Sequence, residues 1–103
     1  MLTIREQYIQ PETFESNMRT KTQEKMPEVF RKLGFVFFFY SNEGSEPIHI
    51  HVRKAGGFAK FWVEPIELDY AQGMKIQDLK NAEDLISENK DLIIMKWNEI
   101  HGS

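Results

Sequence analysis

The chain has 103 residues, of which 41% are hydrophobic and 13% aromatic, so it is long enough for one buried core and short for two. Its formal net charge of -3 disfavours binding to nucleic acid through bulk charge, and no stretch approaches the roughly 18 apolar residues of a membrane helix. Because cysteine is absent from the sequence, disulfides, thiolate zinc sites and cysteine nucleophiles are excluded.

The first 25 residues differ in character from the rest of the chain. Residues 1–25 are mostly polar with scattered apolar positions, and Pro11 interrupts any helix, so they are predicted to form a loosely ordered arm. The N-terminus lacks the apolar run of a secretory signal, and the expected compartment is therefore the cytoplasm. Residues 26–103 are expected to form a single α+β domain.

From Glu28 the pattern becomes that of β-strands. The strongest signal is the aromatic run 35–40, which follows a turn at Gly34. Since this run is apolar on both faces, it predicts a central strand covered by helices on one side and partly covered on the other.

The next strands are predicted around a pair of glycines. Residues 48–54 alternate apolar and polar side chains, and Gly56-Gly57 is expected to close a hairpin into residues 58–64. Pro65 cannot donate a hydrogen bond to a strand ladder, so residues 66–70 are predicted as an edge strand or a bulged continuation. Together these segments predict a small antiparallel β-meander.

After Gly73 the apolar residues recur at helical spacings. The pattern predicts helix between about residues 76 and 100, packed on one face of the sheet. One uninterrupted helix of this length would extend about 37 Å, longer than a small sheet can cover, so a break is expected near residues 87–89. Trp97 belongs to the apolar stripe and is expected in the core, whereas His101 is expected to be frayed.

Pairing the hairpin strands places chemically active side chains on one face. With Gly56-Gly57 as the loop, the predicted pairs are His49 with Glu64, His51 with Trp62, and Arg53 with Lys60. A one-residue slip of the pairing would put polar and apolar side chains on the same face of the sheet, which favours this register. The polar face is therefore predicted to carry His49, His51, Arg53, Lys60, Trp62 and Glu64.

Three interpretations of this face remain open. It is a solvated or partner-covered surface with an ordinary His49–Glu64 pair; or His49, His51 and Glu64 form a two-histidine, one-carboxylate set for a divalent metal. In the third, a histidine performs acid/base chemistry on a phosphodiester while Arg53 and Lys60 hold the phosphate. The simplest expectation is that no cofactor binds. Glu43 and Glu46, in the turn-rich loop before the histidines, are expected to be solvated, as are most glutamates in turns.

A longer, ordered series of residues extends over about residues 26–102: Met26-Pro27, Gly34-Phe35, residues 37–43, Glu46-Pro47, His49, His51-Val52, Ala59-Lys60-Phe61, Glu64-Pro65, Glu88-Asn89 and Trp97-Asn98-Glu99. This series resembles the small bacterial family known as domain of unknown function 4160. The resemblance implies a place in a two-gene operon, commonly beside a member of domain of unknown function 2442, in an arrangement similar to toxin-antitoxin modules. It therefore implies a small protein partner encoded by a neighbouring gene.

Two functions follow as hypotheses. In the first, the chain is a toxin-antitoxin-like operon component that binds this small protein partner. In the second, it is a nuclease-like or metal-dependent enzyme whose catalytic residues are His49, His51, Glu64, Arg53 and Lys60, with His49, His51 and Glu64 as the metal ligands. RNA and a second copy of the chain remain open as further partners, and no membrane partner is expected.

Overall fold

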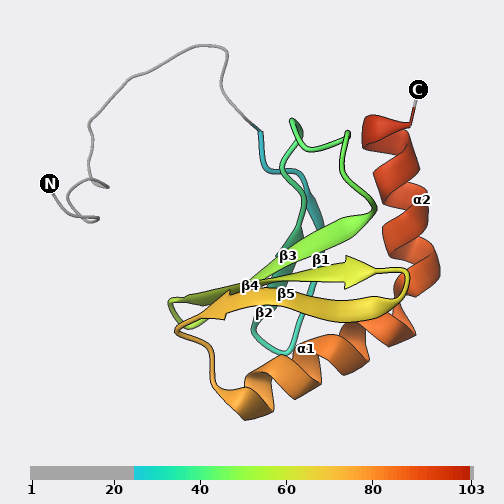
Figure 1. Ribbon diagram of the computed structural model, residues 1–103. Helices are drawn as coiled ribbons and strands as arrows, with labels where there is room; N and C mark the ends of the chain where they lie inside the picture. The colour runs from blue at the N-terminus through green and yellow to red at the C-terminus, as the bar shows by residue number, and fades with distance from the viewer. Residues whose placement is uncertain (1–24, 103) are drawn as a thin grey trace, which may run out of the picture.

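The computed structural model describes residues 25–102, so the arm predicted at residues 1–25 lies outside the described residues except for Lys25. The described chain forms a five-stranded antiparallel sheet followed by two helices, which confirms the expected α+β meander (Figure 1). Strands neighbouring in the sheet are also consecutive in the chain. The elements are β1 (Glu28–Lys32), β2 (Phe35–Phe38), β3 (His49–Lys54), β4 (Gly57–Val63), β5 (Ile66–Gln72), α1 (Ile76–Glu88) and α2 (Lys90–His101).

One face of the sheet packs against both helices. Because successive side chains of a strand point to opposite faces, alternate residues of the central strands share this buried side. Each fully buried Phe, Ile or Val contributes about 1.5–3 kcal/mol through removal of apolar surface from water. The strands contribute Phe35, Phe37, Ile50, Val52, Ala59, Phe61 and Val63 to this core, the residue after β2 contributes Phe39, and the helices add Ala82, Leu85, Ile86, Ile93 and Trp97.

The β3–β4 hairpin closes one residue earlier than predicted. Ala55 and Gly56 adopt positive φ angles of 49° and 84° and form the two-residue turn, as a tight hairpin with the right-handed twist requires. Lys54 therefore pairs with Gly57, which belongs to the strand. The sequence indicated two glycines as the turn, but an alanine in the left-handed region takes the first of the two positions.

This turn changes every predicted pair along the hairpin. His49 is opposite Trp62, His51 is opposite Lys60, and Arg53 is opposite Phe58, so the predicted partners are wrong by two residues. A shift of two residues leaves each side chain on the same face of the sheet. The two histidines and Arg53 therefore still share one face of β3, as predicted.

The predicted break in the helical segment lies at Asn89. Its side-chain amide donates a hydrogen bond to the Leu85 carbonyl oxygen at 2.8 Å, which satisfies an acceptor at the end of α1, and α2 begins at the next residue. His101, expected to be frayed, is the last residue of α2 and packs on Trp97 with ring centroids 4.2 Å apart. Neither helix of the described chain is long and apolar enough to cross a membrane.

The last strand shows both features that its proline indicated. β5 is an edge strand, and its pairing with β4 shifts register between Lys60 and Phe61. The bulge increases the local twist of this edge. β3, the strand that carries the histidines, lies in the middle of the sheet.

Candidate functional site

The loop between β2 and β3 folds back over β3 and delivers Glu43 to both strand histidines. The Glu43 Oε1 atom lies 2.7 Å from His49 Nε2 and 2.8 Å from His51 Nε2. The two imidazoles converge because residues two apart on a strand project from the same face. We call Glu43, His49 and His51 the imidazole–carboxylate cluster.

The cluster is buried among aromatic rings where α2 passes the end of the sheet (Figure 1). His49 is 0% exposed and His51 is 5% exposed, so both imidazoles are removed from bulk water. The ring-centroid distances from the two imidazoles to their aromatic neighbours are between 4.6 and 5.6 Å. These neighbours are Phe38 and Tyr40 around His51, and Trp62 and Trp97 around His49.

Burial and hydrogen bonding determine the charges in the cluster. Burial lowers the pKa of His51, and the hydrogen bond to Glu43 opposes this effect without cancelling it. Burial by itself would raise the pKa of Glu43, but its close polar contacts with His49 and His51 outweigh burial and hold that pKa below its ordinary value. At neutral pH the cluster therefore contains an ionised carboxylate and a neutral His51.

The carboxylate that the sequence placed beside the histidines lies elsewhere. Glu64 follows the end of β4, and its carboxylate is 3.8 Å from Lys90 Nζ of α2. Glu43, expected to be a solvated turn residue, takes the place beside the imidazoles. The available signal was two glutamates in a loop leading directly into the His-x-His strand, but strand periodicity says nothing about where a loop side chain folds.

The two predicted phosphate-binding cations already have partners. Lys60 Nζ lies 2.8 Å from a Glu46 carboxylate oxygen and 3.5 Å from one of Asp69. The Arg53 guanidinium lies over the Phe38 ring, 5.1 Å from its centroid. Arg53 and Lys60 are not opposed, so the like-charge pair that pointed to an anion does not form. Holding a phosphate with Lys60 would require displacing its carboxylates.

Together, these features define a small α+β protein with a buried imidazole–carboxylate cluster at one end of an antiparallel sheet. The chain belongs to the family described as a domain of unknown function (DUF4160), whose model matches residues 34–98. This match includes the whole cluster and confirms the family that the sequence resembled. No curated protein and no solved structure matches the chain.

Proposed function

We propose that this protein is a partner-binding module, one component of a toxin-antitoxin-like pair, and that a small protein docks on its open face. The open face is the side of the sheet that carries Phe38, Arg53, Phe58 and Tyr70. The observation that carries this proposal is that, within residues 25–102, the helices pack on the opposite side of the sheet (Figure 1).

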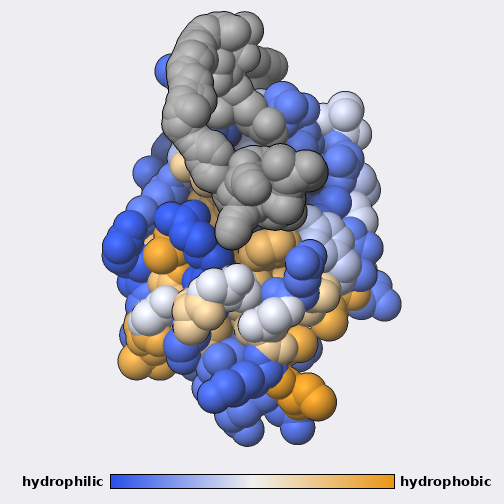
Figure 2. All heavy atoms as spheres, turned by 90° about the vertical axis from the view of Figure 1, so that its left-hand side faces the viewer, coloured by the Kyte–Doolittle hydropathy of each residue, from blue (hydrophilic) through white to orange (hydrophobic). Residues whose placement is uncertain are grey.

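Aromatic side chains on the open face surround a hollow of about 180 Å³. Phe58 is 42% exposed, Tyr70 is 47% exposed, and Met26 at the rim is 49% exposed. Clustered exposed apolar side chains are typical of protein interaction sites, and aromatic residues contribute most to such interfaces. On the face of the molecule seen in Figure 2, hydrophobic side chains lie among hydrophilic ones. The open face therefore offers an apolar docking surface.

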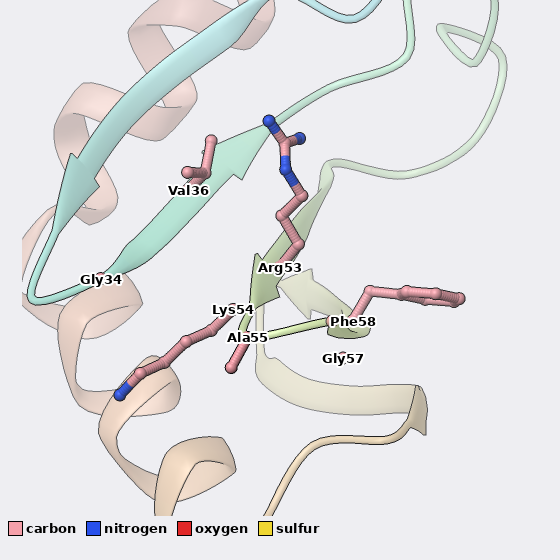
Figure 3. A pocket seen from close by; sticks show the side chains of 8 residues that line it. Gly34, Val36, Arg53, Lys54, Ala55, Gly57 and Phe58 are labelled. Carbon is pink, nitrogen blue, oxygen red and sulfur yellow. The ribbon is translucent and has the colours of Figure 1, made fainter.

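A second hollow of about 270 Å³ extends this surface to the tip of the hairpin (Figure 3). Arg53 and Phe58 line both hollows. Figure 3 shows Arg53 and Lys54 leaving β3 in different directions, and Lys54 Nζ bonds to Asp78 of α1 at 3.1 Å. Among the residues that line these two hollows, Arg53 is the exposed cation, which suits a partner that presents an apolar side chain next to a carboxylate.

The family resemblance supports one kind of partner. The resemblance implies a neighbouring gene for a member of domain of unknown function 2442, so the partner we propose is the small protein of that gene. A pair encoded together is produced together, which favours a stable complex. Within residues 25–102 the helices lie on the other side of the sheet, which leaves the open face for such a partner.

Co-expression with a tagged form of the neighbouring gene product tests this proposal. The wild-type chain should copurify with that product and elute with it in size-exclusion chromatography. The Phe58→Ala, Tyr70→Ala double variant should bind at least about tenfold more weakly, because aromatic anchors dominate interface energetics. Ile76→Ala is the matched control, since Ile76 is 73% exposed at the start of α1 and lies outside the open face. Separate elution of the wild-type proteins, or equal binding by the double variant, would count against the proposal.

A nuclease-like or metal-dependent enzyme remains the alternative, and the imidazole–carboxylate cluster is the observation in its favour. A buried histidine bonded to an ionised carboxylate is a common arrangement for a general base. An enzyme acting on RNA would lose that activity in the His51→Ala variant. Equal growth and equal RNA integrity in cells expressing the wild type and this variant would remove the alternative.

A further inference from the structure

A neutral His49 imidazole has one N–H hydrogen but faces an acceptor at each of its two ring nitrogens. His49 Nδ1 lies 3.0 Å from the Pro47 carbonyl oxygen, which can only accept a hydrogen bond, so Nδ1 carries the hydrogen. In a neutral imidazole the Nε2 atom then holds a lone pair. That lone pair faces Glu43 Oε1 at 2.7 Å, and an ionised carboxylate is also only an acceptor. Two acceptors this close require positive charge between them.

A second proton on His49 is one way to supply this charge. It would place an imidazolium on a side chain that is 0% exposed, and burying a charge is costly unless pairing repays the lost hydration. Two carboxylates lie near this ring, and each has another partner. Glu43 Oε1 is shared with His51 Nε2 at 2.8 Å, and Glu46 Oε1, 3.8 Å from His49 Nδ1, is bound by Lys60 Nζ at 2.8 Å. A metal ion supplies the charge differently, because it takes one lone pair from each of the three groups.

We infer that Glu43, His49 and His51 form a binding site for a divalent transition metal of the Zn²⁺ class. The potential ligand atoms of these residues all lie within 4.8 Å of one another. The Pro47 carbonyl supports His49 in the way that metal-bound histidines are usually supported, since it fixes the hydrogen on Nδ1 and points the lone pair of Nε2 inward.

The cluster must rearrange to hold an ion. Ligand atoms at about 2.0–2.2 Å from a tetrahedral Zn²⁺ lie roughly 3.4 Å from one another, about 0.6–0.7 Å more than the distances between Glu43 and the imidazoles. Glu43 can move outward by this amount, because it belongs to a loop and its side chain is 24% exposed. The ligand atoms of the cluster span up to 4.8 Å, so the two imidazoles must also turn toward each other between their aromatic neighbours.

The chemistry of the ligands selects the metal. Two imidazole nitrogens and one carboxylate suit Zn²⁺ and neighbouring transition metals, whereas Mg²⁺ and Ca²⁺ prefer sets made only of oxygen atoms. Three protein ligands also leave a fourth position for water or another donor. Bound metal would tie the loop that carries Glu43 to β3. The site lies within one chain, so metal binding can be measured in the absence of the proposed protein partner.

Zn²⁺ titration of the full chain tests the site. The chain is purified with a removable tag, stripped with a chelator and titrated with Zn²⁺ by calorimetry, with Mg²⁺ in a parallel titration. We expect one Zn²⁺ per chain and no matching signal with Mg²⁺. Glu43→Gln should weaken Zn²⁺ binding by at least about 100-fold. Loss of a residue that only supports a metal ligand usually costs about 10–100-fold in affinity, and loss of a ligand should cost at least as much.

The matched control is Glu64→Gln, the same substitution at the carboxylate that the sequence predicted as a ligand; it should bind Zn²⁺ as the wild type does. Circular dichroism checks the fold of each variant, and His51→Gln replaces Glu43→Gln if the latter is unfolded. Failure of the wild type to bind Zn²⁺ stoichiometrically would overturn the site. A folded Glu43 or His51 variant that binds Zn²⁺ as tightly as the wild type would also overturn it. The same holds if the Glu43 and Glu64 variants lose equal Zn²⁺ affinity. The isolated chain is used throughout, so this result does not depend on partner binding.

Discussion

The histidines of β3 differ in what surrounds them, although both accompany Glu43. His49 is enclosed by Trp62 and Trp97 and bonded through both ring nitrogens. His51 stacks on Phe38 and also lines the hollow of the open face. Small changes at His51 therefore affect both the cluster and the surface on which we propose that a partner binds.

The lowered pKa of His51 makes stability depend on pH. Burial is the main cause, and it places the folded-state pKa below the ordinary value of 6.5, so the unfolded chain binds this proton more readily. The stabilisation is present above the unfolded-state pKa and is lost as the pH falls through the folded-state pKa. Burial is also the main cause that lowers the pKa of His101, so His101 contributes to the pH dependence of stability in the same direction. The lowered pKa of Glu43 contributes only at lower pH, below its ordinary value of 4.5.

We therefore expect the free energy of unfolding to decrease as the pH is lowered from about 7.5 to about 5.5. In the His51→Gln variant this decrease should be smaller. Urea unfolding at both pH values, with a chelator present, measures the two slopes. Identical slopes for the wild type and the variant would show that His51 does not cause the dependence.

At the scale of elements, two adjacent glycines shape the hairpin end of the sheet for different reasons. Gly56 has a φ of 84° with open space around the position that a Cβ would take. Gly57 begins β4, and a Cβ there would run into the backbone carbonyl of Gly73, beyond the end of β5. The first glycine is required by its conformation and the second by close approach of two chain segments.

This difference predicts the effects of two alanine substitutions. Gly56→Ala should cost about 1–2 kcal/mol, the usual cost of a left-handed conformation for a residue with a Cβ. Gly57→Ala should cost more, because a backbone segment would have to move to make room for the new methyl group. Unfolding midpoints in urea compare the two variants directly. A smaller loss for Gly57→Ala than for Gly56→Ala would contradict the close packing of β4 against Gly73.

At the scale of the whole molecule, Trp97 joins the helical layer to the sheet and to the cluster. Its ring lies 5.3 Å from that of Phe39 and 5.1 Å from that of His49, measured between centroids. It is 6% exposed and forms part of the main hydrophobic core. The same side chain therefore holds α2 on the sheet and forms a wall of the imidazole–carboxylate cluster.

Removing this ring should be among the most destabilising single changes. Trp97→Ala is expected to cost about 3–5 kcal/mol, a large share of the roughly 5–15 kcal/mol typical of a whole domain. Met95→Ala on the same helix should cost far less, because Met95 is 49% exposed. Chemical unfolding of both variants measures the difference. Similar losses in the two would mean that Trp97 does not connect the layers.

The sequence alone determined the features that depend on local spacing. Alternation of side chains placed both histidines on one face of β3, and helical spacing predicted the packing of Trp97 and the break that occurs at Asn89. These features could be predicted because strand and helix periods depend only on the backbone of the segment itself. The family resemblance likewise required only the order of residues along the chain.

Only the tertiary structure decided which groups meet. The hairpin register depends on Ala55 adopting the left-handed conformation, and two neighbouring glycines indicated a different turn. Glu43 reaches the histidines because its loop closes back over the sheet, while Glu64, which has the correct strand parity, lies beyond the end of β4 near Lys90. The path of a loop results from packing across the whole domain and has no period, so spacing along the chain could predict the two imidazoles but not the carboxylate between them.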